Sequence, residues 1–367
     1  MLYNRKTNVM DVHEKPTRRS FLGKVASSAV GLTVSAGPAQ TIFATDMTRP
    51  LEDEDLLLAH QSSEKKFVPV MITPFTTDMK IDFEMLSRLI DFYLAAGVKG
   101  FFANCLSSEM YNLDDEERLA LTRFVVKRVN GAVPVVASGS FGRTIEERAE
   151  FTKKIYHTGV NAVILITSHF ADQADDDNML LHNFEQYFKY TDNIPLGTYE
   201  CPAPYKRILS PEVFSHLLGT NRLVYHKDTE LIPERIKTKL KLAQGNRLEF
   251  YDAHAPNTMT SLQGGAKGMS AIAGNFYPEI FVWMCNHVND PNRQEDVKWL
   301  QSEITRLDTI VSQGYPLSSK YFLQKRGLPI QVSSRSAQGP LTVDQKRAMD
   351  ELSSTLAGWH ERLGIKA

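Results

Sequence analysis

From residue 67 onward, short apolar segments alternate with segments of helical periodicity, eight times in succession. Strands that are separated by a crossover helix pair in parallel, so the alternation predicts a parallel sheet covered by helices. Eight such units close a (β/α)8 TIM barrel. The predicted strands cover residues 67–73, 99–105, 133–138, 162–167, 195–201, 223–227, 248–253 and 268–273.

The segments between these strands carry helix start signals. Asp114 precedes three acidic residues, and the segment from Thr144 to Glu147 has the form of a capping box. Ser210 followed by Pro211 is a further helix start. An open, doubly wound sheet is the alternative fold, but no G-x-G-x-x-G turn follows the first strand. Further predicted helices cover residues 83–96, 178–190, 232–243, 258–263 and 278–288.

After residue 288 the pattern is helical only. Helical spacing is present in 296–312, 315–323 and 342–363. We therefore expect a barrel over 66–288 and a C-terminal helical subdomain over 289–367.

The first 44 residues have a different composition. Arg18 and Arg19 are followed by Phe21-Leu22 and a weakly apolar run with small residues. This arrangement resembles a twin-arginine signal peptide, which predicts export to the periplasm or beyond, with residues 45–65 as a linker. The run is too rich in Ser, Gly and Pro for a transmembrane helix, and no other apolar span is long enough.

Charge and cysteine content exclude several classes of protein. The formal net charge is -1 and no run of Lys or Arg is present, which argues against a nucleic-acid partner. Cys105, Cys201 and Cys285 all stand in apolar surroundings, and an odd count argues against a disulfide framework. We expect all three to be buried thiols.

Lys227, at the end of the sixth predicted strand, is the most informative residue. Function in such a barrel lies at the carboxyl ends of the strands. A lysine buried there is costly unless it is paired or neutral, and desolvation makes its amine a nucleophile toward carbonyl groups. Strand alternation places Lys227 and Tyr225 on one face and His226 on the other. A lysine in water just past the strand end is the alternative, and spacing alone does not decide.

Four further segments, in their order and spacing around Lys227, resemble the dihydrodipicolinate synthase and N-acetylneuraminate lyase family of class I aldolases. The resemblance extends from about residue 67 to the end of the chain. The segments resemble the family's T-P-F, its G-T-T-G-E loop with the following L-x-x-E-E-R, its Y-N-x-P and its L-G-A-x-G. In this chain they are ITPF at 72–75, LSSE at 106–109 with LDDEER at 113–118, YECP at 199–202 and QGGAKG at 263–268.

The resemblance implies that Lys227 forms an imine with the keto group of a 2-oxo acid such as pyruvate, with no other cofactor and no metal. Tyr199 would be the phenol that transfers protons, and Ser107 would hold the carboxylate of the substrate. It also implies a small-molecule substrate and a homo-oligomer, either a dimer or a tetramer. The predicted substrate-binding residues are Ser107, Leu106, Thr73 and Ser270.

The chain departs from the family at several of its functional positions. Leu106 and Phe170 stand where dihydrodipicolinate synthase has the Thr and Tyr of its proton relay, and neither side chain can exchange a proton. Pro204 stands where an Arg holds the second substrate, although Lys206 or Arg207 could substitute. These changes argue against lysine-biosynthetic activity. They favour a divergent aldolase, lyase or dehydratase that acts on another 2-oxo acid, such as one derived from a sugar.

Two glycines of the G-T-T-G-E loop are also replaced, by Cys105 and Ser108, whose bulk would reshape the loop backbone. Two other classes of function remain open. One is a barrel that binds a carbonyl ligand without catalysis. The other is a metal-dependent hydrolase, for which the candidate ligands are His169, Glu200, Asp252 and His254.

Overall fold

The computed structural model describes residues 64–337 and 339–366. The predicted signal peptide, and the predicted linker up to residue 63, therefore lie outside the described residues. Within the described part of the chain, no helix is both long and apolar enough to cross a membrane.

The described strands form one parallel sheet that closes on itself. The order within the sheet is β1-β8-β7-β6-β5-β4-β3-β2, and a parallel bridge between Val70 and Phe102 joins its two ends. The predicted (β/α)8 barrel is thereby confirmed. The strands are β1 (Lys66–Phe67), β2 (Phe101–Phe102), β3 (Val135–Ser138), β4 (Ala162–Ile166), β5 (Leu196–Tyr199), β6 (Leu223–Asp228), β7 (Glu249–Asp252) and β8 (Gly268–Met269).

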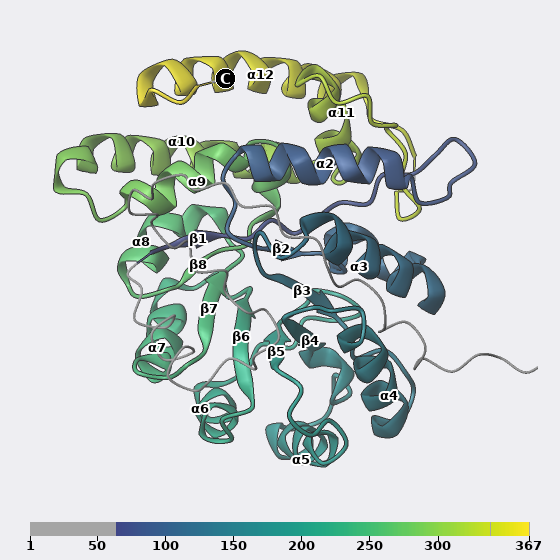
Figure 1. Ribbon diagram of the computed structural model, residues 1–367. Coiled ribbons are helices and arrows are strands. Elements are labelled where there is room, and N and C mark those ends of the chain that lie inside the picture. Colours follow the sequence, from purple (N-terminus) through teal and green to yellow (C-terminus); the bar gives the residue numbers. More distant parts are fainter. Residues whose placement is uncertain (1–63, 338, 367) are drawn as a thin grey trace, which may run out of the picture. The chain divides into compact units, whose positions relative to one another are not determined.

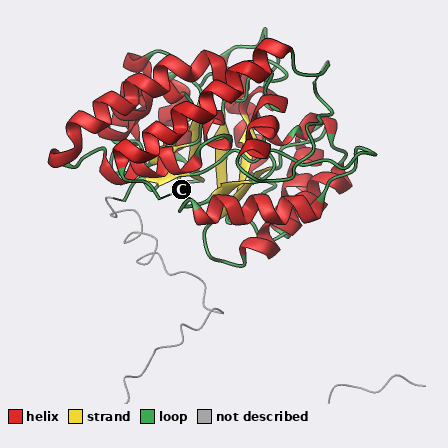
Figure 2. Ribbon diagram, turned by 90° about the horizontal axis from the view of Figure 1, so that it is seen from above, coloured by secondary structure: helices red, strands yellow, loops and turns green. Residues whose placement is uncertain are grey.

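Helices surround the ring of strands (Figure 1), and seen from above the strands lie inside a layer of helices (Figure 2). One helix follows each strand, so every strand has its amino end at one rim of the barrel and its carboxyl end at the other. The helices are α2 (Phe83–Ala95), α3 (Asp115–Val129), α4 (Ile145–Tyr156), α5 (Asp177–Phe188), α6 (Pro211–Gly219), α7 (Pro233–Ala243), α8 (Thr258–Gln263) and α9 (Pro278–His287).

The helix start signals read from the sequence are confirmed. The Thr144 hydroxyl accepts from the Glu147 N–H at 3.2 Å, while the Glu147 carboxylate accepts from the Thr144 N–H. Asp114 and Glu117 form the same reciprocal box at the start of α3. Ser210 caps α6, whose first residue is a proline. These caps satisfy N–H groups that a helix leaves unpaired in its first turn.

Three strands are shorter than predicted. β1, β2 and β8 span two residues each, whereas the predicted segments are 67–73, 99–105 and 268–273. For β1 the cause is Pro69, which has no N–H to donate to a neighbouring strand. After β8 the chain turns within a few residues into the 3-10 helix η5 (Ile272–Asn275).

The C-terminal segment is helical, as predicted. It contains η6 (Pro291–Arg293), α10 (Gln294–Ser312), α11 (Leu317–Lys325) and α12 (Val343–Leu363). Helix α12 packs on α11 and α10 (Figure 1). Helix α10 itself packs against η5 and against η4 (Ala255–Asn257), which follow β8 and β7. The C-terminal helices therefore reach the rim at which the strands end.

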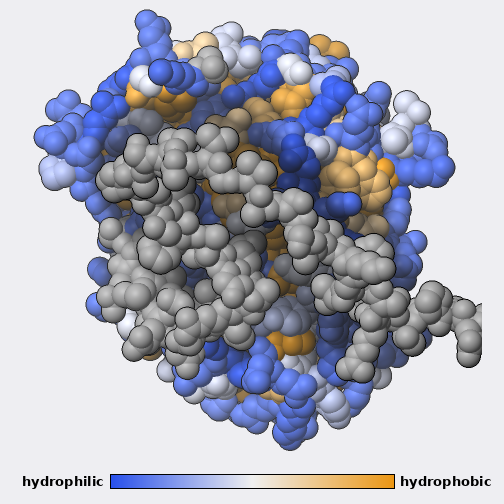
Figure 3. Space-filling model, in the orientation of Figure 1, coloured by the Kyte–Doolittle hydropathy of each residue, from blue (hydrophilic) through white to orange (hydrophobic). Residues whose placement is uncertain are grey.

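Where the described residues are visible in Figure 3, their surface is mostly hydrophilic and the hydrophobic areas are smaller. The hydrophobic side chains gather instead in one core that is continuous from the barrel to α12. Burial of this apolar surface is the main source of stability for the fold.

The close approach of β1 and β8 depends on Gly268. A Cβ atom at this position would lie 2.0 Å from the Lys66 carbonyl oxygen, which belongs to the backbone and cannot move aside cheaply. We expect Gly268→Ala to lower the free energy of unfolding by about 3 kcal/mol, measured by urea denaturation. Gly358→Ala is the matched control, because a Cβ there meets nothing within 4 Å in the exposed face of α12. Equal stability of the two variants would contradict this account of barrel closure.

Candidate active site

Lys227 lies inside the barrel. In the sheet register it pairs with Tyr199 of β5 and Tyr251 of β7. Its side-chain nitrogen lies 4.3 Å from the ring centroid of Tyr199 and 5.5 Å from that of Phe102. Only 3% of the residue is exposed. The alternative of a lysine in bulk water at the strand end is therefore excluded by the structure.

No ion pair joins the Lys227 ammonium to a carboxylate within the described residues. Burial lowers the pKa of Lys227 to about 8, although the Cys105 and Cys201 thiols act in the opposite direction. An ammonium that loses hydration without gaining a counter-ion is easier to deprotonate. The amine is therefore available as a nucleophile close to neutral pH.

The residues on either side of Lys227 point away from the barrel interior. The His226 ring lies 4.9 Å from the ring of Phe214 in α6, and its Nδ1 lies 2.8 Å from the Thr198 hydroxyl. This confirms the alternation inferred from the sequence, with Lys227 inward and His226 toward the helices.

A cavity of about 470 Å³ opens over the carboxyl ends of the strands and includes Lys227. Of the residues predicted from the sequence, it brings together Tyr199, Leu106, Ser107 and Ser270 around this lysine. Ser107 and Leu106 lie in the 3-10 turn η1 (Leu106–Ser108), which follows β2. The cavity is thus lined by a hydroxyl and an aliphatic side chain from η1 as well as by the Lys227 amine.

Thr73 is not among the residues that line this cavity. Its buried hydroxyl donates to the Ser108 carbonyl at 2.8 Å, and so supports the η1 turn. Ser270 does line the cavity, and its hydroxyl donates to the Val68 carbonyl at 2.8 Å. The structure thus places Thr73 behind the site and Ser270 at its wall.

Burial raises the pKa of Tyr199 well above its usual value, and the nearby Cys201 and Cys105 thiols raise it further. The phenol is therefore neutral over the pH range in which enzymes work. Burial also raises the pKa of Cys201, to about 11, so this thiol is protonated as well. All three cysteines are free and buried, as the sequence predicted.

The C-terminal helices contribute residues that the sequence did not reveal. Asp308 and Ser312 of α10 line the cavity, together with Tyr315 and with His254 after β7. Burial raises the pKa of Asp308, while nearby His254 lowers it. No local signal could have found Asp308 and Ser312, because α10 follows the last strand in the chain and reaches the site only through tertiary packing. His254, in contrast, was already a candidate from its position after the seventh predicted strand.

Lys206 and Arg207, both considered as substitutes for the missing arginine, have different positions. Lys206 lines the cavity, and its ammonium donates to the Thr229 carbonyl at 2.5 Å. Arg207 forms an ion pair with Asp177 at 2.9 Å and is not among the cavity residues. Lys206 alone of the two is placed to meet an anionic ligand.

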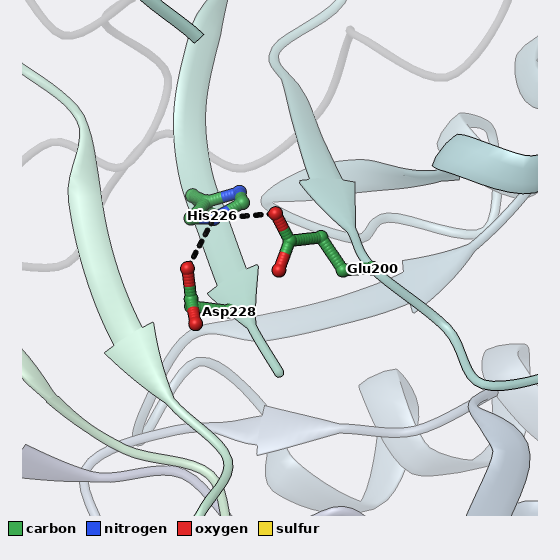
Figure 4. A group of neighbouring side chains, drawn as sticks. All are labelled: Glu200, His226 and Asp228. Carbon is green, nitrogen blue, oxygen red and sulfur yellow. Dashed lines mark hydrogen bonds and ion pairs between the residues drawn. The ribbon is translucent and has the colours of Figure 1, made fainter. Parts of the chain in front are cut away.

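A second charged group lies on the helix side of β6, opposite Lys227. Glu200, His226 and Asp228 converge there from β5 and β6 (Figure 4). The His226 Nε2 atom lies 3.4 Å from an Asp228 oxygen and 3.8 Å from a Glu200 oxygen. Within the described residues this is the one group with the donor atoms and spacing of a metal site.

Lys239 of α7 already supplies a cation to this group. Its ammonium lies 2.6 Å from Glu200 and 2.7 Å from Asp228, and all of these side chains are buried. Burial by itself lowers the pKa of Lys239, but the two carboxylates outweigh it and the pKa is raised. A bound divalent ion would have to displace or repel this ammonium, so the residues present do not fit a metal site.

The metal-site hypothesis based on the sequence is not supported by the geometry. His169, Glu200, Asp252 and His254 do not form a metal-ligating group among the described residues. Asp252 instead accepts from the His254 N–H at 2.7 Å and from the Ser261 hydroxyl. The carboxylate of Asp252 is thus engaged in holding α8 and the loop before it.

Comparison with known proteins identifies the family. Residues 63–356 match the model of the dihydrodipicolinate synthetase family, so the chain belongs to that family. A 4-hydroxy-tetrahydrodipicolinate synthase of Bacillus subtilis (strain 168) is 28% identical over 288 residues, which are 78% of this chain and 96% of that protein. One of Oceanobacillus iheyensis is 26% identical, over 73% of this chain and 85% of that protein.

Solved structures share the fold. YagE of E. coli K12, a prophage protein of the dihydrodipicolinic acid synthase family in complex with pyruvate, has a TM-score of 0.72 at 21% identity. The match covers 80% of this chain and 98% of YagE. The dihydrodipicolinate synthase of Acinetobacter baumannii with pyruvate has a TM-score of 0.70 at 20% identity, over 83% of this chain and all of the other.

Family membership makes this protein an enzyme of the aldolase and lyase type, which favours catalysis over a barrel that only binds a ligand. The expectation that it lacks lysine-biosynthetic activity is not supported, because its curated relatives are named 4-hydroxy-tetrahydrodipicolinate synthases.

The variant Lys239→Met tests whether the Lys239 ammonium stabilises the buried carboxylates of Glu200 and Asp228. Removing the ammonium leaves Glu200 and Asp228 buried without their cation, so we expect the free energy of unfolding to fall by about 3–5 kcal/mol. Urea denaturation measures the change. Lys241→Met on the exposed side of the same helix is the control and should have little effect. Unchanged stability together with a stoichiometric divalent metal in the purified protein would contradict our account.

Proposed function

We propose that this protein is a Schiff-base-forming lyase or aldolase in which Lys227 condenses with the keto group of pyruvate or another 2-oxo acid. The observation that carries the proposal is a buried amine at the wall of a cavity, with no carboxylate partner in the described part of the chain. Such an amine has little other use in a barrel interior, where an unpaired charge is costly.

The neutral Lys227 amine attacks the keto carbon and forms a carbinolamine, which loses water to give the iminium ion. Ser107, which lines the same cavity, donates a hydrogen bond to the substrate carboxylate. Tyr199 transfers protons during dehydration. Its phenol is neutral, and the centre of its ring lies 4.3 Å from the Lys227 nitrogen. The imine is covalent, so this chemistry requires no separate cofactor.

The rest of the cavity receives the second carbonyl compound or the remainder of a longer keto acid. Lys206 offers a cation, and Asp308, Ser312 and His254 offer groups that bind hydroxyls. This set suits a hydroxylated or anionic substrate, such as a 2-oxo acid derived from a sugar.

Incubation with pyruvate and a panel of aldehydes, followed by mass analysis of the products, identifies the second substrate. The same experiment decides whether 4-hydroxy-tetrahydrodipicolinate is a product.

We also propose that the protein is exported, on the basis of Arg18, Arg19 and the apolar run after them. In a bacterial host with an active twin-arginine pathway, we expect a periplasmic form that lacks about the first 44 residues. Replacement of both arginines by lysine should retain the longer form in the cytoplasm. Intact mass and cell fractionation measure this, and a full-length cytoplasmic product from both proteins would refute export.

Reductive trapping with pyruvate tests the imine. Because only the neutral amine reacts, a pKa of about 8 makes the initial trapping rate rise about tenfold from pH 6 to pH 7 and level off above pH 9. Intact mass should show one adduct, absent in Lys227→Ala and present in the Lys241→Met control.

Peptide mapping must assign the adduct to Lys227 and not to Lys320. Lys320 is a second buried lysine, and burial lowers its pKa to about 8 as well. A trapping rate that still rises tenfold between pH 9 and pH 10 would indicate an ordinary exposed lysine. No adduct with pyruvate or any other 2-oxo acid would refute the proposed function.

A further inference from the structure

Tyr111 and His169 form a polar pair at the edge of the cavity. The Tyr111 hydroxyl lies 2.9 Å from Nε2 of His169 and 2.8 Å from the carbonyl oxygen of Ala203. Tyr111 comes from the 3-10 turn η2 (Met110–Asn112) and lines the same cavity as Lys227. His169 belongs to η3 (Thr167–His169), directly after β4.

The other nitrogen of His169 fixes the tautomer of the ring. Nδ1 lies 2.6 Å from the Ser140 carbonyl oxygen, which can only accept a hydrogen bond. Nδ1 therefore carries a hydrogen. In the neutral ring, Nε2 then has a lone pair and can only accept from the Tyr111 hydroxyl.

The single hydrogen of the Tyr111 hydroxyl consequently has two acceptors, His169 Nε2 and the Ala203 carbonyl. It can serve only one of them at a time. If Nε2 gains a proton, His169 donates to the phenol oxygen, Tyr111 donates to Ala203, and every group is satisfied. The hydrogen-bond geometry thus provides a place for one additional proton.

Electrostatics make that proton transient. Burial lowers the pKa of His169 to about 4, the bond to Ser140 acts in the opposite direction, and Arg148 and Arg118 lower it further. These two arginines are the charged groups that act on the ring. The pair can therefore accept a proton through its geometry and release it again because of its surroundings.

The pair is connected to the proposed imine site. Tyr199 and Tyr111 both line the cavity that includes Lys227. Burial raises the pKa of both phenols, and the nearby Cys201 thiol raises both pKa values further. Tyr199, Tyr111 and, through its bond to Tyr111, His169 are thus groups able to exchange protons that meet at one cavity.

We propose that Tyr111 and His169, both from this chain, are the proton relay for the imine chemistry at Lys227. The inference rests on the proposed function. It accounts for the two positions, Leu106 and Phe170, at which the sequence lacks the hydroxyls expected of a relay. Phe170 packs in the core, with its ring 4.3 Å from that of Phe184, and offers no replacement.

The proton balance assigns the relay two roles. The Lys227 ammonium gives one proton to the relay, the amine attacks the keto carbon, and a proton moves from nitrogen to oxygen to form the carbinolamine. Its hydroxyl then takes the stored proton from Tyr199 and leaves as water, which yields the iminium ion. Loss of a C3 proton gives the enamine, and that proton returns through Tyr199 and Tyr111 to Nε2 of His169.

The test separates imine formation from proton transfer. Exchange of the pyruvate methyl hydrogens in D2O, followed by NMR, reports the second role, while reductive trapping at equilibrium reports the imine. We expect Tyr111→Phe to slow exchange about 100-fold and His169→Asn about tenfold, with the trapped fraction unchanged. Asparagine can keep the bond to Ser140, which preserves the local fold.

Tyr190→Phe and His216→Asn are the matched controls, because each removes a comparable surface contact, to Glu146 and Glu185 respectively. Urea denaturation verifies that all four variants fold. If the wild type traps pyruvate but exchange in Tyr111→Phe and His169→Asn equals the controls, the relay is wrong and the proposed function stands. Loss of the trapped adduct in these variants would show a structural role and overturn the relay. No trapping by the wild type would overturn both proposals.

Discussion

The burial of one unpaired ammonium is the constraint on which the rest of the site depends. Lys227 keeps a nucleophilic amine near neutral pH because the closed barrel removes its water and the described residues give it no counter-ion. The rings of Phe102 and Tyr199 lie beside its nitrogen. Aromatic rings attract a cation weakly through their π electrons but carry no charge to neutralise it. The bridge between Val70 and Phe102 that closes the sheet is therefore part of the same arrangement.

The two faces of β6 differ in whether their charged side chains are paired. Toward the barrel axis, Lys227 has no charged partner among the residues that the structure describes. Toward the helices, Glu200 and Asp228 share Lys239, so the negative charges next to Tyr199 and Lys227 in the chain are held away from the cavity. A carboxylate facing inward would raise the pKa of Lys227 back toward its ordinary value. Pairing on the helix side thus preserves the electrostatics of the site while fixing β5 and β6 next to each other.

Much of the fold could be predicted from local patterns, and some of it could not. The caps at Thr144, Asp114 and Ser210 were predicted because a cap acts within three residues. The lengths of β1, β2 and β8 were not, because apolar residues near a barrel rim are buried whether or not they form ladder hydrogen bonds. Ser107 and Ser270, predicted as substrate-binding residues, line the cavity, whereas Thr73, predicted for the same role, supports the η1 turn.

The sequence by itself determined the eight strand–helix units and the placement of Lys227 and His226 on opposite faces of one strand, since both follow from periodicities of two and 3.6 residues along the chain. That Lys227 is the one facing inward was decided by the tertiary structure. Tertiary structure alone decided what surrounds that lysine. It brought Asp308 and Ser312 of α10 to the cavity, joined Lys239 to Glu200 and Asp228, and placed Tyr111 against His169. Burial, charge pairing and hydrogen bonding act through space between residues far apart in the chain, so no local pattern records them.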